Sequence, residues 1–222
     1  MTSHKATIAV IGGTGALGQG LARRLAAAGH PLIIGSRTVE KAREAAVRIP
    51  APAGCERPRG ATNADAAGAA QIVLVTVPWG SQAGILDEIR PHVAGKLVID
   101  TTVPLVPPKV ARAQLPPEGS AALVAQKRLG EGVRVVSAFH NVAAHKLQKD
   151  EPIDCDILVF GDDPQDRETA IRVVAAAGLR GIHAGPLANS AAAEALTSVL
   201  IGINRNYKAD GAGIRITGIA TS

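Results

Sequence analysis

Aromatic residues are almost absent from this chain. Its 222 residues include one tryptophan, one tyrosine and two phenylalanines, together 2% of the sequence. Proteins that bind RNA or single-stranded DNA stack bases on aromatic side chains, so this scarcity argues against a nucleic-acid partner. Alanine, valine, isoleucine and leucine must therefore supply the core, and a chain of this length can bury one without disulfides.

Cysteine and long apolar runs are also scarce. The two cysteines, Cys55 and Cys155, form neither a CxxC pair nor a zinc-ligand spacing. We therefore expect no metal site and two free thiols in a reducing cytoplasm. No apolar segment near the start predicts a signal peptide. No uncharged apolar run reaches the roughly 18 residues that span a membrane, so we expect no membrane contact.

Charge is modest but unbalanced. Lysine and arginine number 24 against 19 acidic residues, a formal net charge of +5. Hydrophobic residues make up 46% of the chain, which excludes a disordered protein. Because the basic residues are scattered rather than in one run, the composition favours a small polyanionic ligand.

Short apolar runs alternate with alanine-rich helical stretches. The expected strands lie at 7–11, 32–34, 72–77, 96–100, 133–139 and 157–160. The expected helices lie at 16–28, 39–49, 82–89, 120–129 and 164–177. In the first helix Leu17, Leu21 and Leu25 share one face, while Arg23 and Arg24 are expected to point away. This alternation predicts an α/β protein with a Rossmann-type, doubly wound and mainly parallel sheet.

The pattern changes near the end of the chain. Leu196, Val199, Leu200 and Ile203 mark a long amphipathic helix, and a strand-like segment follows at 214–216. We predict that residues 1–140 form a Rossmann core. Residues 141–222 are then a C-terminal extension, a small cap of helix and strand that completes the substrate site and forms a dimer face.

A glycine pattern lies between the first strand and the first helix. Gly13, Thr14, Gly15, Ala16, Leu17 and Gly18 match G-x-G-x-x-G in the context that a dinucleotide fingerprint requires. We expect Gly13 to permit the tight turn, Gly15 to let the backbone approach a pyrophosphate, and Gly18 to let helix and strand pack closely. The start of the helix then supplies N–H groups to the phosphates.

The end of the second strand indicates which dinucleotide is bound. An NAD site has an acidic residue there for the ribose hydroxyl. Here the strand ends at Ser36 and Arg37, with Lys41 one helical turn further on. A hydroxyl, a guanidinium and an ammonium attract a 2′-phosphate. The sequence therefore predicts NADP(H).

Most familiar catalytic sets for hydride transfer are missing. Tyr207 is followed four positions later by Gly211, so the Tyr-x-x-x-Lys pair of short-chain reductases is absent. His140 and Asn141 follow the strand at 133–139, at the sheet edge where ligands bind. His140 is the candidate catalytic residue, as a proton donor or as a residue that positions a ring.

Other candidates follow neighbouring strands in the same way. Thr76, Pro78 and Trp79 come at the end of the strand at 72–77, and Pro104 follows the strand at 96–100. If the second substrate is itself a hydride-accepting ring, the protein need only hold two rings face to face, because orientation then supplies most of the rate.

Several segments together resemble the NADPH-dependent F420 reductases (F420H2:NADP oxidoreductases). The matching segments are Ile11–Gly18, Gly35–Arg37, Val77-Pro78-Trp79, Val136–His140, Ala184–Asn189 and Asn204–Lys208. The resemblance implies a homodimer that exchanges a hydride between NADP(H) and the deazaflavin coenzyme F420. It places the phosphates on Thr14–Leu17 and the 2′-phosphate on Ser36, Arg37 and Lys41.

The resemblance also implies where the deazaflavin lies. It places this ring near the C-terminal segment and near Pro78, Trp79, Pro104, His140 and Asn141. The anionic tail of F420 suits a basic protein, with Arg205, Lys208 and Arg215 as candidate contacts. Two alternatives stay open: an NADPH-dependent reductase of another flavin or of a ferric chelate, and a non-catalytic NADP-binding redox sensor.

Overall fold

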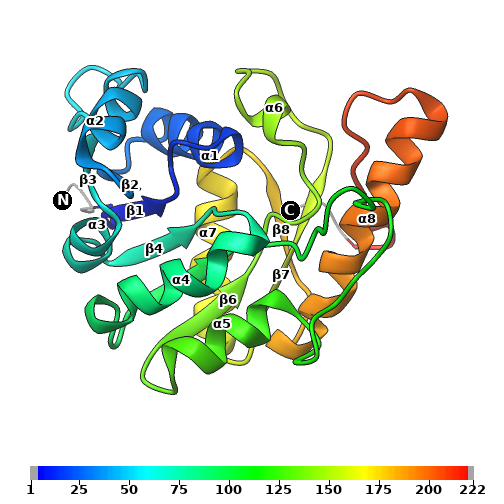
Figure 1. Ribbon diagram of the computed structural model, residues 1–222. Helices are drawn as coiled ribbons and strands as arrows, with labels where there is room; N and C mark the ends of the chain where they lie inside the picture. The colour runs from blue at the N-terminus through cyan, green and yellow to red at the C-terminus, as the bar shows by residue number, and fades with distance from the viewer. Residues whose placement is uncertain (1–4, 220–222) are drawn as a thin grey trace.

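The computed structural model describes residues 5–219 and folds them around one eight-stranded sheet (Figure 1). The strands are β1 (Ile8–Ile11), β2 (Leu32–Ser36), β3 (Arg59–Thr62), β4 (Ile72–Val75), β5 (Leu97–Asp100), β6 (Arg134–Ser137), β7 (Asp156–Gly161) and β8 (Arg180–His183). The helices are α1 (Ala16–Ala27), α2 (Val39–Val47), α3 (Asn63–Ala69), α4 (Trp79–Ile89), α5 (Ala121–Leu129), α6 (Ala144–Leu147), α7 (Pro164–Ala176) and α8 (Ser190–Tyr207). Residues 220–222 of the predicted extension lie outside the described part.

The order of strands across the sheet is β3-β2-β1-β4-β5-β6-β7-β8. All neighbours run parallel except β6 and β7. The chain adds β2 and β3 on one side of β1 and then β4 to β6 on the other, so the direction of winding reverses at β1. Such a reversal leaves a crevice beyond the carboxyl ends of the strands, where ligands bind. The predicted Rossmann-type, mainly parallel sheet is confirmed.

Alternate residues of β1 supply two cores, one on each face of the sheet. Ile8 and Val10 pack on the face that also buries Leu21 of α1 and the apolar side of α7. Ala9 and Ile11 pack on the opposite face, against α3, α4 and α5. Each large apolar side chain buried in this way contributes about 1.5–3 kcal/mol. Both faces are covered, which explains why the central strands are continuous apolar runs.

The C-terminal part continues the same sheet. Strands β7 and β8 extend it beyond β6, and α8 stands at that end of the molecule (Figure 1). The division of the chain at residue 140 stays a prediction. The strand predicted at 214–216 is wrong: the structure has no regular strand there, and Ile214 accepts a single backbone hydrogen bond from Asp156 at 2.8 Å.

Candidate functional site

The loop between β1 and α1 follows the glycine pattern with one shift. The left-handed backbone of the turn lies at Gly12, with φ of +72°, one residue before Gly13. Gly13 is instead required for space, because a Cβ there would lie 2.7 Å from the Val10 carbonyl oxygen. At Gly18 a Cβ would lie 2.7 Å from both Gly13 Cα and Thr76 Oγ1. The close packing expected at Gly18 therefore depends on glycine.

Gly15 stands at the open end of this loop. It is the N-cap of α1, in extended backbone and with no side chain to bond the first turn. A Cβ there would have no atom nearer than the Gly12 carbonyl oxygen at 3.5 Å, so the adjoining space is open to a ligand. The first turn of α1 also holds no acidic residue. Its N–H groups and the positive end of the helix dipole can therefore bind a phosphate.

The loop forms one wall of a cleft of about 800 Å³, the glycine-loop cleft. Its other walls are the carboxyl ends of β2 and β4, the first turns of α2 and α3, and one face of α4 from Gly80 to Glu88. The structure thus brings together a large part of the predicted cofactor set: Thr14, Gly15, Ser36, Arg37, Lys41, Thr76, Val77 and Pro78.

One corner of this cleft is basic. Ser36 ends β2 and is nearly buried, while Arg37 and Lys41 are exposed along its rim. Within residues 5–219 neither cation makes a hydrogen bond or an ion pair through its side chain. Thr38 also lines this corner, and its hydroxyl does not cap α2. A phosphate here would meet two free cations and two hydroxyls.

The cleft also contains residues that sequence reasoning missed. Asn63, the first residue of α3, is 1% exposed. Its Oδ1 has no hydrogen-bond partner among the described residues, while its Nδ2 lies 3.5 Å from Glu88 Oε2. A buried amide oxygen without a partner is costly unless a ligand bonds to it. No apolar pattern marks Asn63, so the sequence offers no signal for it.

Thr76 has a structural role beside its place in the cleft. Its Oγ1 and its backbone N–H both donate to the Ile11 carbonyl, at 2.8 and 2.9 Å. These bonds hold the end of β4 against the end of β1. Pro78 then occupies the N-cap position of α4 in extended backbone, so the two strand ends and the start of α4 together form the floor of the cleft.

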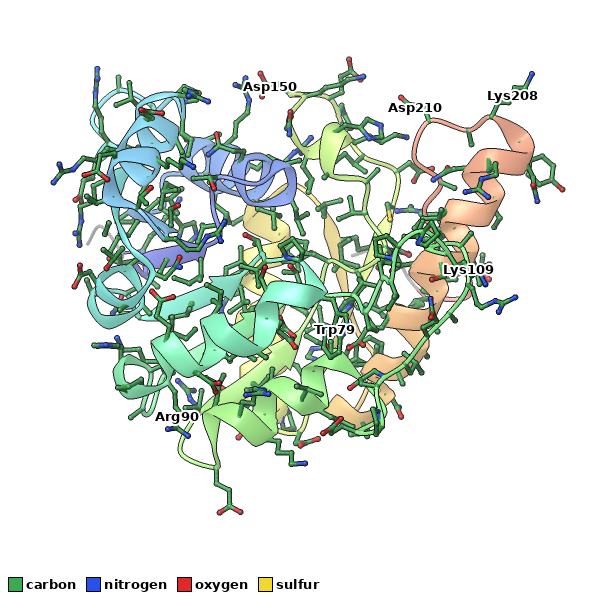
Figure 2. The ribbon with its side chains drawn as sticks, in the orientation of Figure 1. Trp79, Arg90, Lys109, Asp150, Lys208 and Asp210 are labelled. Atoms are coloured by element: carbon green, nitrogen blue, oxygen red, sulfur yellow. The ribbon has the colours of Figure 1, made fainter. Side chains whose placement is uncertain are left out.

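The other predicted cofactor residues lie elsewhere. Gly13 is buried below the loop, and Leu17 packs against the core. Pro104 is buried after β5. Trp79 begins α4 but lines a separate cavity of about 540 Å³ against α5 (Figure 2). Their assignment to a cofactor site stays a prediction.

A further cavity of about 410 Å³, the α8 cavity, lies between α1, α6 and α8. Ala16 lines it, whereas the preceding Gly15 lines the glycine-loop cleft. The start of α1 therefore separates the two cavities, and molecules bound in both would approach one another there. His140 and Asn141 line the α8 cavity, so these two predicted residues lie together and apart from the basic corner.

His140 is held in an unusual environment. It is 4% exposed and follows Phe139, whose backbone is left-handed with φ of +66°. Neither of its ring nitrogens has a hydrogen-bond partner in the described structure. Burial lowers the pKa of His140 to about 4, so the ring is neutral at pH 7. A neutral imidazole with both nitrogens free can donate one hydrogen bond and accept another.

Helix α8 and the segment after it complete this cavity. Thr197 donates to the His140 carbonyl at 2.7 Å, which fixes the strained turn. Asn204 Oδ1 accepts from the backbone N–H of Ala212 at 2.7 Å, so the returning chain forms the outer wall. The sequence did not single out Thr197 or Ala212, because an amphipathic pattern does not tell which partner a helix face meets.

Three further features concern metal binding, membrane spans and disulfides. Within residues 5–219 no group of three or more His, Cys, Asp or Glu residues could hold a metal ion. A search over the same residues finds no helix with the length and hydropathy needed to cross a membrane. The thiol of Cys55 is exposed and that of Cys155 buried, and neither forms a disulfide.

Comparisons with known proteins agree with this geometry. Residues 7–104 match the family described as NADP oxidoreductase, coenzyme F420-dependent. The chain is 43% identical to an F420-dependent NADP reductase of Methanothermobacter thermautotrophicus over 220 residues, 96% of this chain and 95% of that one. A reductase of the same name from Methanocaldococcus jannaschii is 41% identical over 221 residues, 96% of this chain and 98% of that one.

A solved structure extends the comparison to three dimensions. A proposed F420-dependent NADP reductase from Arthrobacter sp. FB24 superposes with a TM-score of 0.78. It is 25% identical in sequence, with 95% of this chain and 98% of that chain covered. The likeness therefore includes the C-terminal part as well as the sheet around the glycine loop.

Proposed function

Because the chain belongs to the coenzyme F420-dependent NADP oxidoreductase family, we propose that it transfers a hydride between NADP(H) and coenzyme F420. The observation that carries this proposal is the 43% identity to an F420-dependent NADP reductase over 96% of the chain. The two cavities on either side of the start of α1 support it, because direct transfer needs two ring systems held close together.

The glycine-loop cleft suits NADP(H). In this proposal the open backbone at Gly15 and the start of α1 bind the pyrophosphate. Ser36, Arg37 and Lys41 bind the 2′-phosphate, and the unpartnered amide of Asn63 takes a hydrogen bond from the ligand. The buried residues Gly13 and Gly18 shape the loop.

The α8 cavity suits the deazaflavin. His140 is our candidate for orienting the ring through a hydrogen bond. A histidine with a pKa of about 4 carries no spare proton at neutral pH, so we favour positioning over proton donation. Bound together, the two substrates supply the hydride chemistry, and the protein holds them and excludes water.

An absorbance assay distinguishes the candidate functions. Purified protein is mixed with NADPH and oxidised F420, and in parallel with FMN, FAD or a ferric chelate. Loss of the F420 absorbance band alone supports the proposal. Turnover only with a flavin or a ferric chelate would show that this compound, and not F420, is the second substrate. NADPH binding without any turnover would favour the redox sensor.

A homodimer in the cytoplasm completes the proposal. Val199, Ile203 and Tyr207 are 53%, 37% and 79% exposed and recur every four residues along α8. They therefore form one apolar stripe beside the α8 cavity, a surface that a second copy of the chain would cover. Free thiols at Cys55 and Cys155 suit a reducing compartment.

A further inference from the structure

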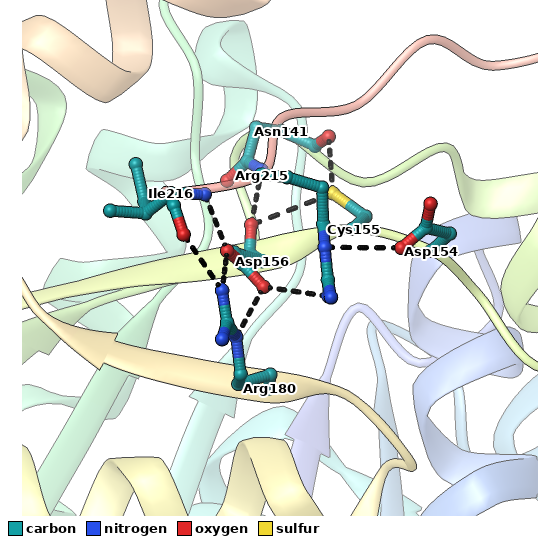
Figure 3. A network of polar contacts seen from close by, with 7 residues as sticks. All are labelled: Asn141, Asp154, Cys155, Asp156, Arg180, Arg215 and Ile216. Atoms are coloured by element: carbon teal, nitrogen blue, oxygen red, sulfur yellow. Dashed lines mark hydrogen bonds and ion pairs between the residues drawn. The ribbon is translucent and has the colours of Figure 1, made fainter. Parts of the chain in front are cut away.

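Asp156, the first residue of β7, is fully buried and every acceptor of its side chain is in use (Figure 3). Arg180 of β8 binds both carboxylate oxygens, with Nε at 2.7 Å from Oδ1. Arg215 Nη1 donates to Oδ1 at 3.1 Å, and the backbone N–H of Ile216 donates to Oδ2 at 2.7 Å. The carboxylate thus joins the sheet to the C-terminal strap, which we define as residues 209–216.

The backbone of the same residue makes two more connections. Its N–H donates to the Ile214 carbonyl at 2.8 Å, again on the strap. Its carbonyl accepts from Asn141 Nδ2 at 2.7 Å. Asn141 Nδ2 also lies 3.2 Å from the sulfur of Cys155 (Figure 3). That sulfur fills the space beside Gly213, where a Cβ would lie 2.7 Å from it. One residue therefore ties the segment after β6 to the C-terminal strap.

These two segments are facing walls of the α8 cavity. The segment after β6 contributes His140 to His145, and the strap contributes Gly211 and Ala212. At the near end of the strap, Asp210 Oδ1 lies 2.7 Å from His145 Nε2. Asp156 holds the far end of the strap and does not line the cavity. It can therefore set the distance between the walls without touching what is bound there.

We propose that Asp156 is a positioning residue that holds the α8 cavity in the shape needed to bind the deazaflavin ring. This inference rests on the proposed function for the identity of the ring. We call Asp156, Arg180 and Arg215 the clamp. Arg215 is consequently paired with Asp154 and Asp156, and is not a free contact for the anionic tail of F420. Asp156 stays ionised near neutral pH, because hydrogen bonds from Arg180 lower its pKa.

The decisive variant is Asp156→Asn, which keeps the shape of the side chain and removes its charge. It leaves Arg180 without a counter-ion and Arg215 with only the exposed Asp154, so the strap is held more weakly. We expect the KM for F420 to rise about tenfold or more, as one charge-assisted contact is worth about that factor. The Kd for NADPH should stay within about twofold, because the clamp does not reach the glycine-loop cleft.

The matched control is Asp166→Asn. Asp166 is also a buried aspartate bound to an arginine, Arg134, at 2.7 Å, but it lies on α7 away from both cavities. It should leave both substrate constants unchanged. Equal effects of the two variants, a parallel loss of NADPH affinity in Asp156→Asn, or an unchanged KM for F420 would each overturn the proposal.

Two further measurements separate the inference from the proposed function. Hydrogen exchange by mass spectrometry, without F420, should show faster exchange in Asp156→Asn at 139–145 and at 209–216, with 12–18 unchanged. Protection of both segments as in the wild type overturns the clamp even if F420 is not the substrate. If Asp156→Asn does not fold, Arg215→Gln cuts the clamp from the half-exposed side and should raise the KM for F420 about threefold. No change in that variant would also overturn the clamp.

Discussion

At the residue scale, the glycines of the loop between β1 and α1 differ in whether an added side chain would disturb cofactor binding or folding. The missing side chain of Gly15 faces open space, whereas the missing side chains of Gly13 and Gly18 face backbone at 2.7 Å. Gly15→Val should therefore leave the chain folded and abolish NADPH binding, because the new side chain occupies the space of the pyrophosphate. Gly18→Ala should instead lower the melting temperature. Calorimetry with and without NADPH checks both, and normal NADPH affinity in Gly15→Val would refute the assignment of the loop.

Arg37 tests the basic corner in the same way. Replacing it by glutamate places an acid where the 2′-phosphate is proposed to bind. Arg37→Glu should raise the KM for NADPH about tenfold or more and change the KM for NADH much less. Arg43→Glu is the control, a charge reversal on the exposed side of α2 outside the cleft. Equal losses in the two variants would point to overall charge rather than to Arg37.

Glu194 is a buried acid that the proposed reaction does not use. Its two oxygens accept the N–H groups of Ala121 and Ala122 at the start of α5, at 2.7 and 3.1 Å. Burial nevertheless raises its pKa from 4.5 to about 8. Between these values the folded state binds more protons than the unfolded state, so stability falls as pH rises.

This predicts a pH dependence with a defined window. The pKa of Asp100 is raised to about 6, so this residue also makes stability fall with rising pH, but at lower pH. The pKa of His140 is lowered to about 4, so this residue makes stability rise with pH up to the ordinary histidine pKa of 6.5. Above pH 6.5 only the contribution of Glu194 remains, and the free energy of unfolding should fall by at most about 1.4 kcal/mol per pH unit. Urea unfolding between pH 6.5 and 8 should show it in the wild type and in Glu131→Gln, an exposed control, but not in Glu194→Gln.

At the scale of elements, central and edge strands differ in how far they could be predicted. β1, β4 and β5 are buried on both faces, so their sequences are apolar runs that read directly as strands. The edge strands β3 and β8 are only partly buried, and their sequences, RGAT and RGIH, carry no such run. The α8 cavity could not be predicted from the sequence for a related reason, because the segments that form it meet only through tertiary contacts.

Arg24 shows the same limit on a helix. The expectation that it points away from the protein is wrong: its guanidinium donates to carbonyls of Lys146, Leu147, Lys149, Glu151 and Ala177. It thus holds the α6 segment, one wall of the α8 cavity, against α1. Arg24→Met should cost about 2–3 kcal/mol in urea unfolding, because these carbonyls lose a charged donor. Arg23→Met, which removes only an exposed pair with Asp150, should cost less than about 1 kcal/mol.

At the scale of the whole molecule, the stripe of Val199, Ile203 and Tyr207 predicts the assembly state. Sedimentation should give a dimer for the wild type and a monomer for Val199→Asp combined with Ile203→Asp, because two charges in an apolar interface are costly. Val47→Asp, an exposed valine on α2, is the control and should remain dimeric. A monomeric wild type would contradict the proposal that this stripe is a dimer interface.

The scarcity of aromatic residues has a practical consequence for the whole protein. Trp79 is its only tryptophan, and it begins α4 directly after Pro78, which lines the glycine-loop cleft. Its ultraviolet emission is therefore a single-site signal, free of overlap from other indoles. The reduced nicotinamide absorbs in the same spectral range, so quenching by resonance energy transfer would report cofactor occupancy in real time, without any attached dye.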